Sequence, residues 1–209
     1  MTKVEMVQLL GWRLGDRDDM EPRIDSELPY VQDYVLEAKE WLPWFLLTET
    51  NAMVASTGTR AVAFPADFLL EAEEGHLYLT VAGEIVKELE KLDYDVALAK
   101  CPGVGEPKYY ATFGDAIQIF PIPDANYSLY FAYYGKGGRL TDTGTLSKWF
   151  LHAGDVVAAE VGKILAEKHI KDAAAAAGFA ADAQAAWNRL YHKHIAMQEL
   201  NNSHVMNGD

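Results

Sequence analysis

The chain has 209 residues, a length that allows one domain with a substantial core, or one core that carries a sizeable insertion. Its composition, 50% apolar and 11% aromatic, excludes an intrinsically disordered protein, because such chains have too few apolar residues to form a core. Eighteen Lys and Arg against 31 Asp and Glu give a formal net charge of −13, which excludes a protein that wraps nucleic acid through dense phosphate neutralisation but allows a passage that repels DNA.

Cys101 is the single cysteine, so the sequence predicts neither an intramolecular disulfide nor a zinc ribbon, and it suits a reducing cytoplasm. Residues 1–20 contain apolar positions but no uninterrupted apolar stretch, and no run approaches the length that spans a bilayer. We therefore expect no signal peptide and no membrane among the partners.

Two helices are predicted at the N-terminus. Thr2 and Glu5 have the spacing of a capping box, in which each side chain satisfies a backbone N–H at the start of a helix. We expect this helix to end at Gly15. A second helix is predicted from near Ser26 to Leu42, with Pro29 in its first turn and Pro43 after its end. The apolar face of the first helix would consist of Val4, Val7, Leu10 and Leu14.

Residues 44–134 have the pattern of antiparallel strands, because short β-branched and aromatic runs alternate with Gly, Pro and Asp. One hairpin is predicted to turn at Glu74-Gly75. Three later strands would turn at Gly114-Asp115 and at Asp124-Ala125. Between these groups, the spacing of apolar residues predicts a short helix from Glu84 to Leu92.

Helical periodicity returns after the polar loop at residues 135–145, and it predicts a long helix from about Leu146 to Ile164 with Ser147 near its cap. The alanine tract at 173–177 would interrupt the helices or bend them around Gly178. A final helix is predicted from about Ala180 to Asn201. Its apolar face would consist of Ala183, Trp187, Leu190, His194 and Met197.

These elements predict an α+β fold in which the N- and C-terminal helices form a four-helix bundle and an antiparallel β-rich region is inserted between them. The expected segments are 1–43 for the first two helices of the bundle, 44–135 for the insertion with one short helix, 136–201 for the last two helices, and 202–209 for a flexible tail.

Several histidines and carboxylates have spacings that bear on catalysis or metal binding. His192 and His194 are two residues apart, so on a helix they point about 200° apart and do not readily share a metal ion. His152 and Asp155 could form a hydrogen-bonded pair on one helix face, but no nucleophile is near them in the sequence. Ser147 is closer to a helix cap than to an activated serine.

Three other features of the sequence resemble parts of catalytic or phosphate-binding sites. Glu71, Glu73 and Glu74 could supply the paired carboxylates of a glycosidase, but they crowd a predicted turn and are interpreted as a solvated acidic turn. The glycine-rich loops at 102–107 and 133–140 lack the full spacing of a phosphate-binding loop. Cys101 has no histidine near it in the sequence. The sequence therefore predicts no catalytic residue, no metal site and no cofactor.

Four tryptophans remain as candidates for the functional surface. Tryptophan and tyrosine dominate both protein cores and subunit interfaces, so core packing and a contact between subunits both stay open for them. These residues are Trp41, Trp44, Trp149 and Trp187.

The order of several short elements between residues 60 and 200 resembles the head-to-tail adaptor (head-completion) proteins of tailed bacteriophages. A Pro-Asp-Phe element comes first, followed by an aromatic pair, a Gly-Asp turn, a Pro-x-Pro-Asp turn, a Tyr-Tyr strand, a Trp-containing helix start and a closing helix. Each element is common by itself, so the resemblance depends on their order and spacing. The N-terminal stretch and residues 76–104 depart from the usual form of the family. The elements are Pro65-Ala66-Asp67-Phe68, Tyr109-Tyr110, Gly114-Asp115, Pro121-Ile122-Pro123-Asp124, Tyr133-Tyr134, Trp149-Phe150 and Trp187.

The resemblance implies a structural virion protein without enzymatic activity. It would be a subunit of a twelve-fold ring that lies beneath the portal, joins the portal to the tail and surrounds the DNA channel. Its expected partners are further copies of itself, the portal protein, the next tail or nozzle protein, and duplex DNA that passes through the lumen without specific binding. It would be made in the host cytoplasm and function in the head-to-tail neck.

By position, the resemblance also implies that the C-terminal segment reaches into the portal. The expected docking residues are Met197, Leu200, Asn201, Asn202, His204, Val205 and Met206. Two alternatives stay open: another neck or tail-completion protein, and a small cell-wall hydrolase with its site at the acidic hairpin or near His152.

Overall fold

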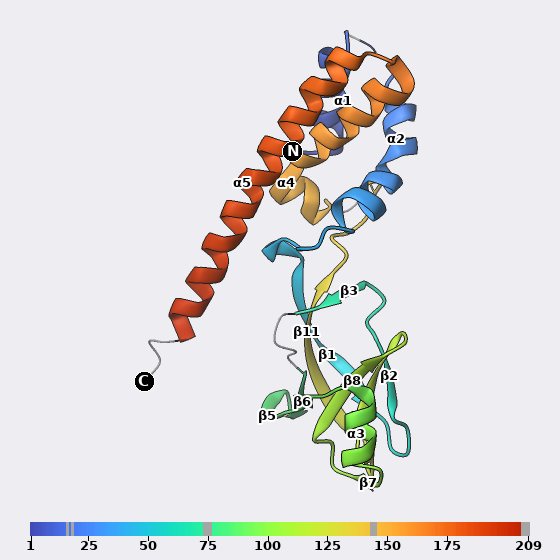
Figure 1. The fold of residues 1–209 in the computed structure, drawn as a ribbon, viewed down its shortest axis with the longest axis vertical. Helices are drawn as coiled ribbons and strands as arrows, with labels where there is room; N and C mark the ends of the chain where they lie inside the picture. The colour runs from blue at the N-terminus through green and yellow to red at the C-terminus, as the bar shows by residue number, and fades with distance from the viewer. Residues whose placement is uncertain (16, 18, 73–76, 143–145, 206–209) are drawn as a thin grey trace. The chain divides into compact units, whose positions relative to one another are not determined.

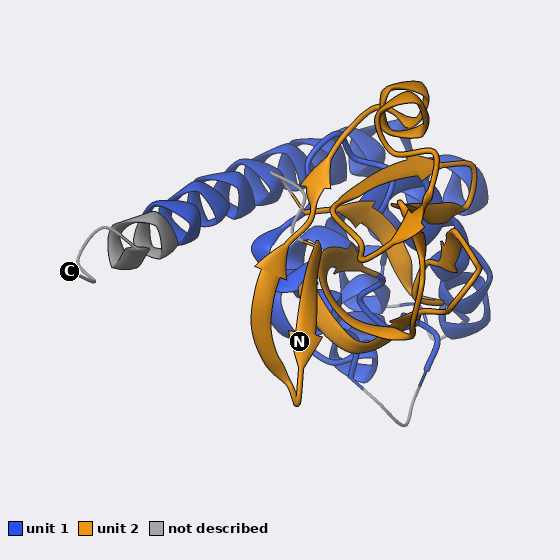
Figure 2. Ribbon diagram, turned by 90° about the horizontal axis from the view of Figure 1, so that it is seen from below, with its two compact units in different colours: residues 1–46, 136–209 blue, residues 47–135 orange. Residues whose placement is uncertain are grey.

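The computed structural model describes residues 1–15, 17, 19–72, 77–142 and 146–205. The chain divides into two compact units, shown in different colours in Figure 2. Unit 1 consists of residues 1–46 and 136–209, and unit 2 consists of residues 47–135. Unit 1 is helical and unit 2 contains the β-strands (Figure 1), so the α+β class predicted from the sequence is confirmed.

Six elements longer than one turn form unit 1, in which two α-helices continue into π-helical segments. In chain order they are α1 (Lys3–Arg13), α2 (Glu21–Tyr30), π-helical η1 (Val31–Leu36), α4 (Lys148–Ile164), π-helical η3 (Leu165–Ile170) and α5 (Ala173–Val205). A short 3₁₀ turn, η2 (Trp44–Leu46), precedes the first strand of unit 2.

The start of α1 was predicted correctly. Glu5 N–H donates to Thr2 Oγ1 at 3.2 Å, and Thr2 N–H donates to the Glu5 carboxylate at 2.7 Å, which completes the capping box. The predicted start of the second helix near Ser26 is wrong, because α2 begins at Glu21 with Pro22 in its first turn. Proline suits that position because the first helical N–H groups have no partner within the helix.

Helices α4 and α5 are the two longest helices of unit 1, and they are antiparallel. Asp155, Glu160 and Gly162 of α4 lie next to Arg189, Trp187 and Phe179 of α5, in that order. Ser147 caps α4, and its Oγ accepts from Trp149 N–H. The expected break at the alanine tract is wrong, since residues 173–178 lie within α5. Alanine has the highest helix propensity, and the reversal between the helices occurs earlier, at the left-handed residue Lys171.

The predicted four-helix bundle is wrong. The described chain contains five α-helices and three sheets, and the fifth helix, α3, lies in unit 2. Helices α1 and α2 have only 11 and 10 residues, against 17 for α4 and 33 for α5. They are too short to match α4 and α5 along their length. Gly15, with φ +96°, follows α1, and the helical conformation of α2 changes to π-helical after Tyr30.

Unit 2 contains eleven strands within its described residues, arranged in three sheets. The largest sheet has the order β1-β11-β4-β5, with β3 also paired to β11, and the second has the order β2-β9-β8-β6. Strands β6 and β8 pair in parallel, as do β7 and β10, so the expectation of purely antiparallel strands is wrong for these two pairs. The strands are β1 (Leu47–Ala55), β2 (Ala61–Ala63), β3 (Phe68–Glu71), β4 (Leu77–Val81), β5 (Glu84–Glu88), β6 (Glu90–Lys91), β7 (Val104–Gly105), β8 (Tyr109–Phe113), β9 (Ala116–Phe120), β10 (Ile122–Pro123) and β11 (Tyr127–Gly135).

The two larger sheets share one core, to which alternate residues of each strand contribute. On β8, Tyr110 faces this core, whereas the next residue, Ala111, faces a smaller cluster with Ala97 of α3 (Tyr94–Lys100). Helix α3 therefore covers the second face of this sheet. The residues of the main core are Met53, Ala55, Val62, Leu77, Leu79, Leu89, Tyr110, Ile117, Ile119, Leu129, Phe131 and Tyr133.

Two further sequence predictions for unit 2 are wrong. The segment from Glu84 to Leu92 forms β5 and β6 rather than a helix, since β5 pairs with β4, with a β-bulge at Val86, and β6 pairs with β8. The turn at Gly114-Asp115 is correct, because β8 and β9 pair across it. The chain at Asp124-Ala125 does not close a hairpin, however, because β9 pairs with β8 and β2 while β11 pairs with β1, β3 and β4. The predicted turn at Glu74-Gly75 lies outside the described residues.

Candidate functional site

All four candidate tryptophans lie in one aromatic cluster of unit 1. The ring of Trp187 on α5 lies 5.7 Å from that of Trp41 and 6.1 Å from that of Trp149 on α4. Phe45 connects Trp149 to Trp44, with ring centroids at 5.2 Å and 5.3 Å. Most of these rings meet edge to face, the arrangement that aromatic quadrupoles favour. The structure thus brings together residues from three separate parts of the sequence.

The apolar spacing of α5 places Trp187 in this cluster. The buried positions of the helix recur every three or four residues, which keeps them on one face toward α4. Trp187 is 8% exposed, and its indole N–H donates to the carboxylate of buried Glu160 on α4 at 2.8 Å. The bond satisfies the single polar atom of the indole in a buried place. The buried positions are Ala176, Phe179, Ala183, Ala186, Leu190 and His194.

The solvent exposure of the rings differs across the cluster. Trp149 is fully buried, whereas Trp41 and Trp44 are half-buried. Trp41 contacts Tyr191 at 5.2 Å between ring centroids, and 45% of Tyr191 is exposed. The two roles left open by the sequence therefore divide by position: Trp149 and Trp187 pack in the core, and Trp41 and Trp44 reach the surface, where an interface remains a prediction.

The surface around Trp44 carries positive charge. Lys193 Nζ of α5 lies 4.9 Å above the ring of Trp44, and the His152 ring of α4 lies 6.2 Å from it. Burial, together with the nearby charges of Lys193 and Lys148, lowers the pKa of His152, so its ring is held in the neutral form. At this surface, aromatic rings lie beside the ammonium groups of lysines.

The hydrogen-bonded pair considered for His152 and Asp155 does not form. His152 stacks on Phe45 at 5.1 Å, while Asp155 pairs instead with Arg189 of α5 at 2.7 Å. The regular helical spacing is interrupted between them, because Ala153 has non-helical φ and ψ of −143° and 36°. Among the described residues, no three His, Cys, Asp or Glu side chains are grouped as a metal site would require.

The glycine-rich loop at 133–140 has a structural use. The carbonyl groups of Gly137 and Gly138 accept hydrogen bonds from Ser147 Oγ at 3.0 Å and 3.1 Å, and Gly137 also accepts from Lys148 N–H at 2.7 Å. A side chain at Gly137 would collide with Trp149, since its Cβ would lie 2.8 Å from that ring. The loop thus holds the start of α4 instead of cradling a phosphate.

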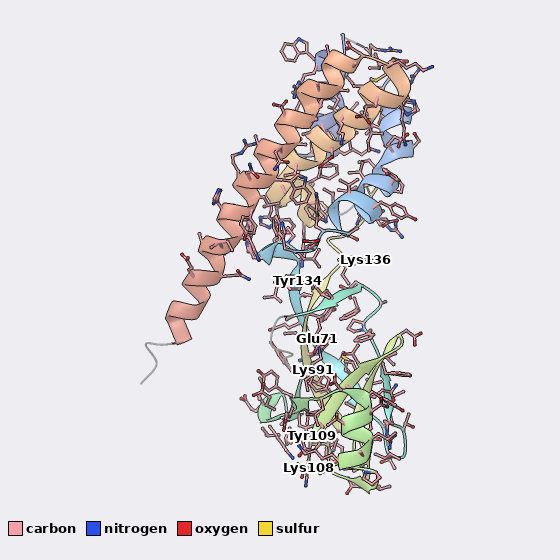
Figure 3. The ribbon with its side chains drawn as sticks, viewed as in Figure 1. Glu71, Lys91, Lys108, Tyr109, Tyr134 and Lys136 are labelled. Atoms are coloured by element: carbon pink, nitrogen blue, oxygen red, sulfur yellow. The ribbon has the colours of Figure 1, made fainter. Side chains whose placement is uncertain are left out.

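Glu71 is the centre of a hydrogen-bond network in unit 2, and the interpretation of this residue as part of a solvated turn is wrong. Its side chain is only 10% exposed and accepts from Lys91 at 2.5 Å, from Thr112 at 3.3 Å and from the Tyr110 hydroxyl. Glu71 and Lys91 are labelled in Figure 3. Glu71 belongs to the sheet of β11, and its partners belong to the sheet of β8. The carboxylate therefore joins the two sheets. Glu73 and Glu74 lie outside the described residues.

Three other tyrosine hydroxyls of unit 2 donate to carboxylates in the same way. Tyr133 donates to Asp67 at 2.8 Å, and burial with this hydrogen bond raises the pKa of Tyr133 to about 12. Burial and the Glu71 carboxylate also raise the pKa of Tyr110. These hydroxyls stay protonated at physiological pH and act as donors. The other two pairs are Tyr127–Asp124 and Tyr130–Glu49.

The predicted portal-docking residues lie toward the end of α5. Met197 is half-buried, and Leu200, Asn201, Asn202, His204 and Val205 belong to the last turns of the helix. Of the predicted flexible tail at 202–209, residues 202–205 are therefore helical, and Met206 to Asp209 lie outside the described residues. No described helix is both long and apolar enough to cross a bilayer.

Comparison with known protein families decides the class of this protein. A model of the SU10 adaptor protein family matches residues 1–206. The chain belongs to the SU10 adaptor protein family. It is thus a phage adaptor protein, a structural component of the virion. No curated protein matches the chain.

Sequence reasoning missed two rings of the aromatic cluster, Phe45 and Tyr191, and one lysine that contacts it, Lys193. Phe45 could have been found because it adjoins Trp44, and Tyr191 because it lies one turn after Trp187. No sequence signal places Lys193 over Trp44, since the contact joins α5 to a short 3₁₀ turn about 150 residues earlier in the chain.

Proposed function

We propose that this adaptor protein is the subunit of a ring that joins the capsid portal to the tail and surrounds the DNA channel. The match of the adaptor family over residues 1–206 carries the proposal. A twelve-fold ring agrees with the resemblance found in the sequence. Another neck or tail-completion role is the alternative within the same structural class, and no feature of the described residues favours a hydrolase.

The charge of the chain suits a DNA passage. Each copy carries a formal net charge of −13, so twelve copies would surround the duplex with an excess of carboxylates. Phosphates bind through lysine and arginine with release of counterions, and a lumen poor in these residues lets DNA slide without being retained. A map of the ring with a strongly basic lumen would contradict this part of the proposal.

Helix α5 suits a docking element. Its buried stripe extends to His194, and the helix continues to Val205, about 16 Å further at a rise of about 1.5 Å per residue. An isolated helical end is marginal in water, because most helical stability in proteins comes from packing. We propose that the segment from Met197 to Met206 is stabilised in the virion by the portal.

The proposal is tested by mixing the full chain with its portal protein and averaging negatively stained particles. We expect a twelve-fold ring attached to one end of the portal, even if the isolated chain is monomeric, because a portal can act as a template for the ring. A truncated chain that ends at Asn201 should lose portal binding while its circular dichroism spectrum stays nearly unchanged. Retained binding by the truncated chain would refute the docking segment, and portals without attached rings would refute the ring.

A further inference from the structure

The outer part of the β4–β5 hairpin in unit 2 is exposed, whereas Leu77 and Leu79 of β4 belong to the core. The pairing of the two strands shifts by one residue between Ile85 and Lys87, a β-bulge that interrupts the alternation of faces along β5. Ile85 and Val86 at this bulge are both exposed, at 54% and 56%. The turn of the hairpin is the two-residue loop Ala82-Gly83, in which both residues have positive φ, 53° and 89°, as in the tight turns of stiff hairpins.

The tip of this hairpin is both apolar and acidic. Val81, at 64% exposed, adds to the apolar surface of Ile85 and Val86. Glu84 and Glu88 are exposed carboxylates, and the one lysine of β5, Lys87, is paired with Glu106 at 2.5 Å. The described residues of the sheet place β5 at its edge, with β4 as its one neighbour. An exposed apolar edge of this kind tends to pair or dock.

Unit 1 carries a surface of the opposite charge, here called the lysine patch and defined as Trp44, Lys148, Leu151, His152 and Lys193. Leu151 is 59% exposed, and it shares one face of α4 with Lys148 and His152, three residues before it and one after. Lys193 reaches this face from α5 through its contact with Trp44.

The helix segments that carry the lysines of the patch contain few carboxylates, whereas Glu40 and Glu49 lie on either side of Trp44 in the sequence. Residues 146–154 and 187–198 contain no Asp or Glu, and Asp155, which follows the first segment, is paired with Arg189. In a chain with 31 carboxylates and 18 Lys and Arg, such an area is where an acidic surface can approach without repulsion.

We propose that the β4–β5 hairpin of one copy docks on the lysine patch of a second copy. Glu84, next to the turn, would face Lys148 and Lys193, and the exposed apolar residues of the hairpin would cover Leu151 and Trp44. The two surfaces differ, so the contact is heterologous and leaves each copy with one free hairpin and one free patch. Such a contact repeats around a ring, and the inference therefore rests on the proposed ring.

Crosslinking tests the contact directly in the full-length chain. Cys101→Ala removes the single cysteine, and Ile85→Cys and Leu151→Cys are then introduced into separate proteins. Mixing them with the portal protein under mild oxidation should give the mixed disulfide about ten times faster than the control pair of Val96→Cys with Leu151→Cys, because docking raises the local concentration of the thiols. Val96 is 50% exposed and lies on α3 of the same unit, so it matches Ile85 in accessibility. Equal rates for the two pairs would overturn the proposal.

Charge reversal gives the second test. Lys148→Glu with Lys193→Glu in the Leu151→Cys protein should slow the mixed disulfide by about tenfold or more, and Glu84→Lys in the Ile85→Cys partner should restore part of the rate, because close charge pairs at interfaces are strongly coupled. Rescue requires that the two sets of charges meet. Slowing without rescue would overturn this pairing.

Two other occupants of the lysine patch are tested alongside. If the double lysine variant loses binding to a 30-base-pair duplex or to the portal, while no Ile85–Leu151 disulfide forms in the unchanged background, the patch belongs to that partner and the proposal is overturned. Rings that assemble on the portal without the crosslink would refute this inference alone. A crosslink without rings on the portal would instead refute the proposed function.

Discussion

In unit 1 an aromatic cluster extends from the core to the surface, whereas in unit 2, which also has packed rings, tyrosine hydroxyls donate to carboxylates. The rings of Trp41, Trp149 and Trp187 pack edge to face, and of these three Trp41 is half-buried while the other two are buried. The hydroxyls of Tyr110 and Tyr133 end on Glu71 and Asp67. Aromatic packing depends on area and gives a surface that can extend into a partner, while directional hydrogen bonds fix the relative register of two sheets. In unit 2 the hydrogen bonds of Glu71 therefore hold two sheets together, whereas in unit 1 half-buried Trp41 and Trp44 leave part of the aromatic cluster at the surface.

The largest expected effect breaks the aromatic side of this comparison. Trp149→Ala should destabilise the protein by about 4 kcal/mol, because it leaves a cavity at the centre of the cluster. Trp12→Ala should change stability by less than about 0.5 kcal/mol, since Trp12 is 73% exposed.

Hydrogen exchange followed by mass spectrometry shows where the effect of Trp149→Ala is felt. Faster exchange in residues 1–46 and 146–199, with little change in β8 and β9, is the expected result. Equal acceleration in both units would show that they do not differ as described.

The hydrogen-bonded side is tested with Glu71→Gln, which removes the charge that three donors share. We expect the free energy of unfolding to fall by about 2 kcal/mol, because the buried donors lose their charged acceptor. Glu49→Gln is the matched control, since Glu49 also accepts from a tyrosine, Tyr130, but is exposed. Urea unfolding monitored through exchange in β8 measures both variants. A loss for Glu49→Gln as large as that for Glu71→Gln would contradict the structural role of burial.

Two glycines sharpen the account of the α4–α5 contact. A Cβ at Gly162 would lie 2.5 Å from the Phe179 ring, whereas a Cβ at Gly178 would meet nothing within 4 Å. Gly162→Ala should therefore lower the free energy of unfolding by about 1–3 kcal/mol through overpacking. Gly178→Ala should raise it by about 0.5–1 kcal/mol, because alanine has the higher helix propensity. Thermal unfolding of the two variants should shift in opposite directions, and shifts of the same sign would contradict the packing described for this pair.

The smallest effect concerns a polar contact inside unit 1. Glu27 of α2 lies 2.9 Å from Lys168 and 3.0 Å from His169. Burial alone would raise the pKa of Glu27, but the hydrogen bonds from these two residues outweigh it, and the pKa lies below its ordinary value of 4.5. The stabilisation is therefore present above that value and is lost as the pH falls through the lower pKa of the folded state.

Glu27→Gln should accordingly lower the melting temperature at pH 7, with the difference from the unchanged protein shrinking below about pH 4.5. Circular dichroism melts between pH 7 and pH 3 measure the difference. A gap that stays constant over this range would show that the carboxylate charge of Glu27 contributes nothing.

Local signals were sufficient where a residue acts on its own backbone neighbours. Thr2, Glu5 and Ser147 were recognised as caps because capping needs only residues within one turn. The turn at Gly114-Asp115 was found for the same reason. The α+β class also followed, since the change from helical to alternating periodicity spans long segments.

Other features depended on distant residues and could not be predicted in this way. Ile85 and Leu89 have helical spacing, yet strand β4 offers partners that a local pattern does not contain. Glu71 sits in an acidic stretch typical of a turn, but Lys91 and Tyr110, 20 and 39 residues away, bury it between two sheets. The length of α5 was underestimated because the alanine tract reads as a break in apolar periodicity although it favours helix.

The insertion of unit 2 has a consequence for how such proteins can change. Its first residue, Leu47, pairs across the sheet with Tyr134, next to its last residue, Gly135. Paired residues of this kind have Cα atoms about 4.5–5.5 Å apart, so a loop of about two to four residues could replace the whole unit. Recombination at two points in the gene could therefore replace unit 2 by another inserted domain. The protein could in this way acquire a new binding partner while the helices of unit 1 stay unchanged.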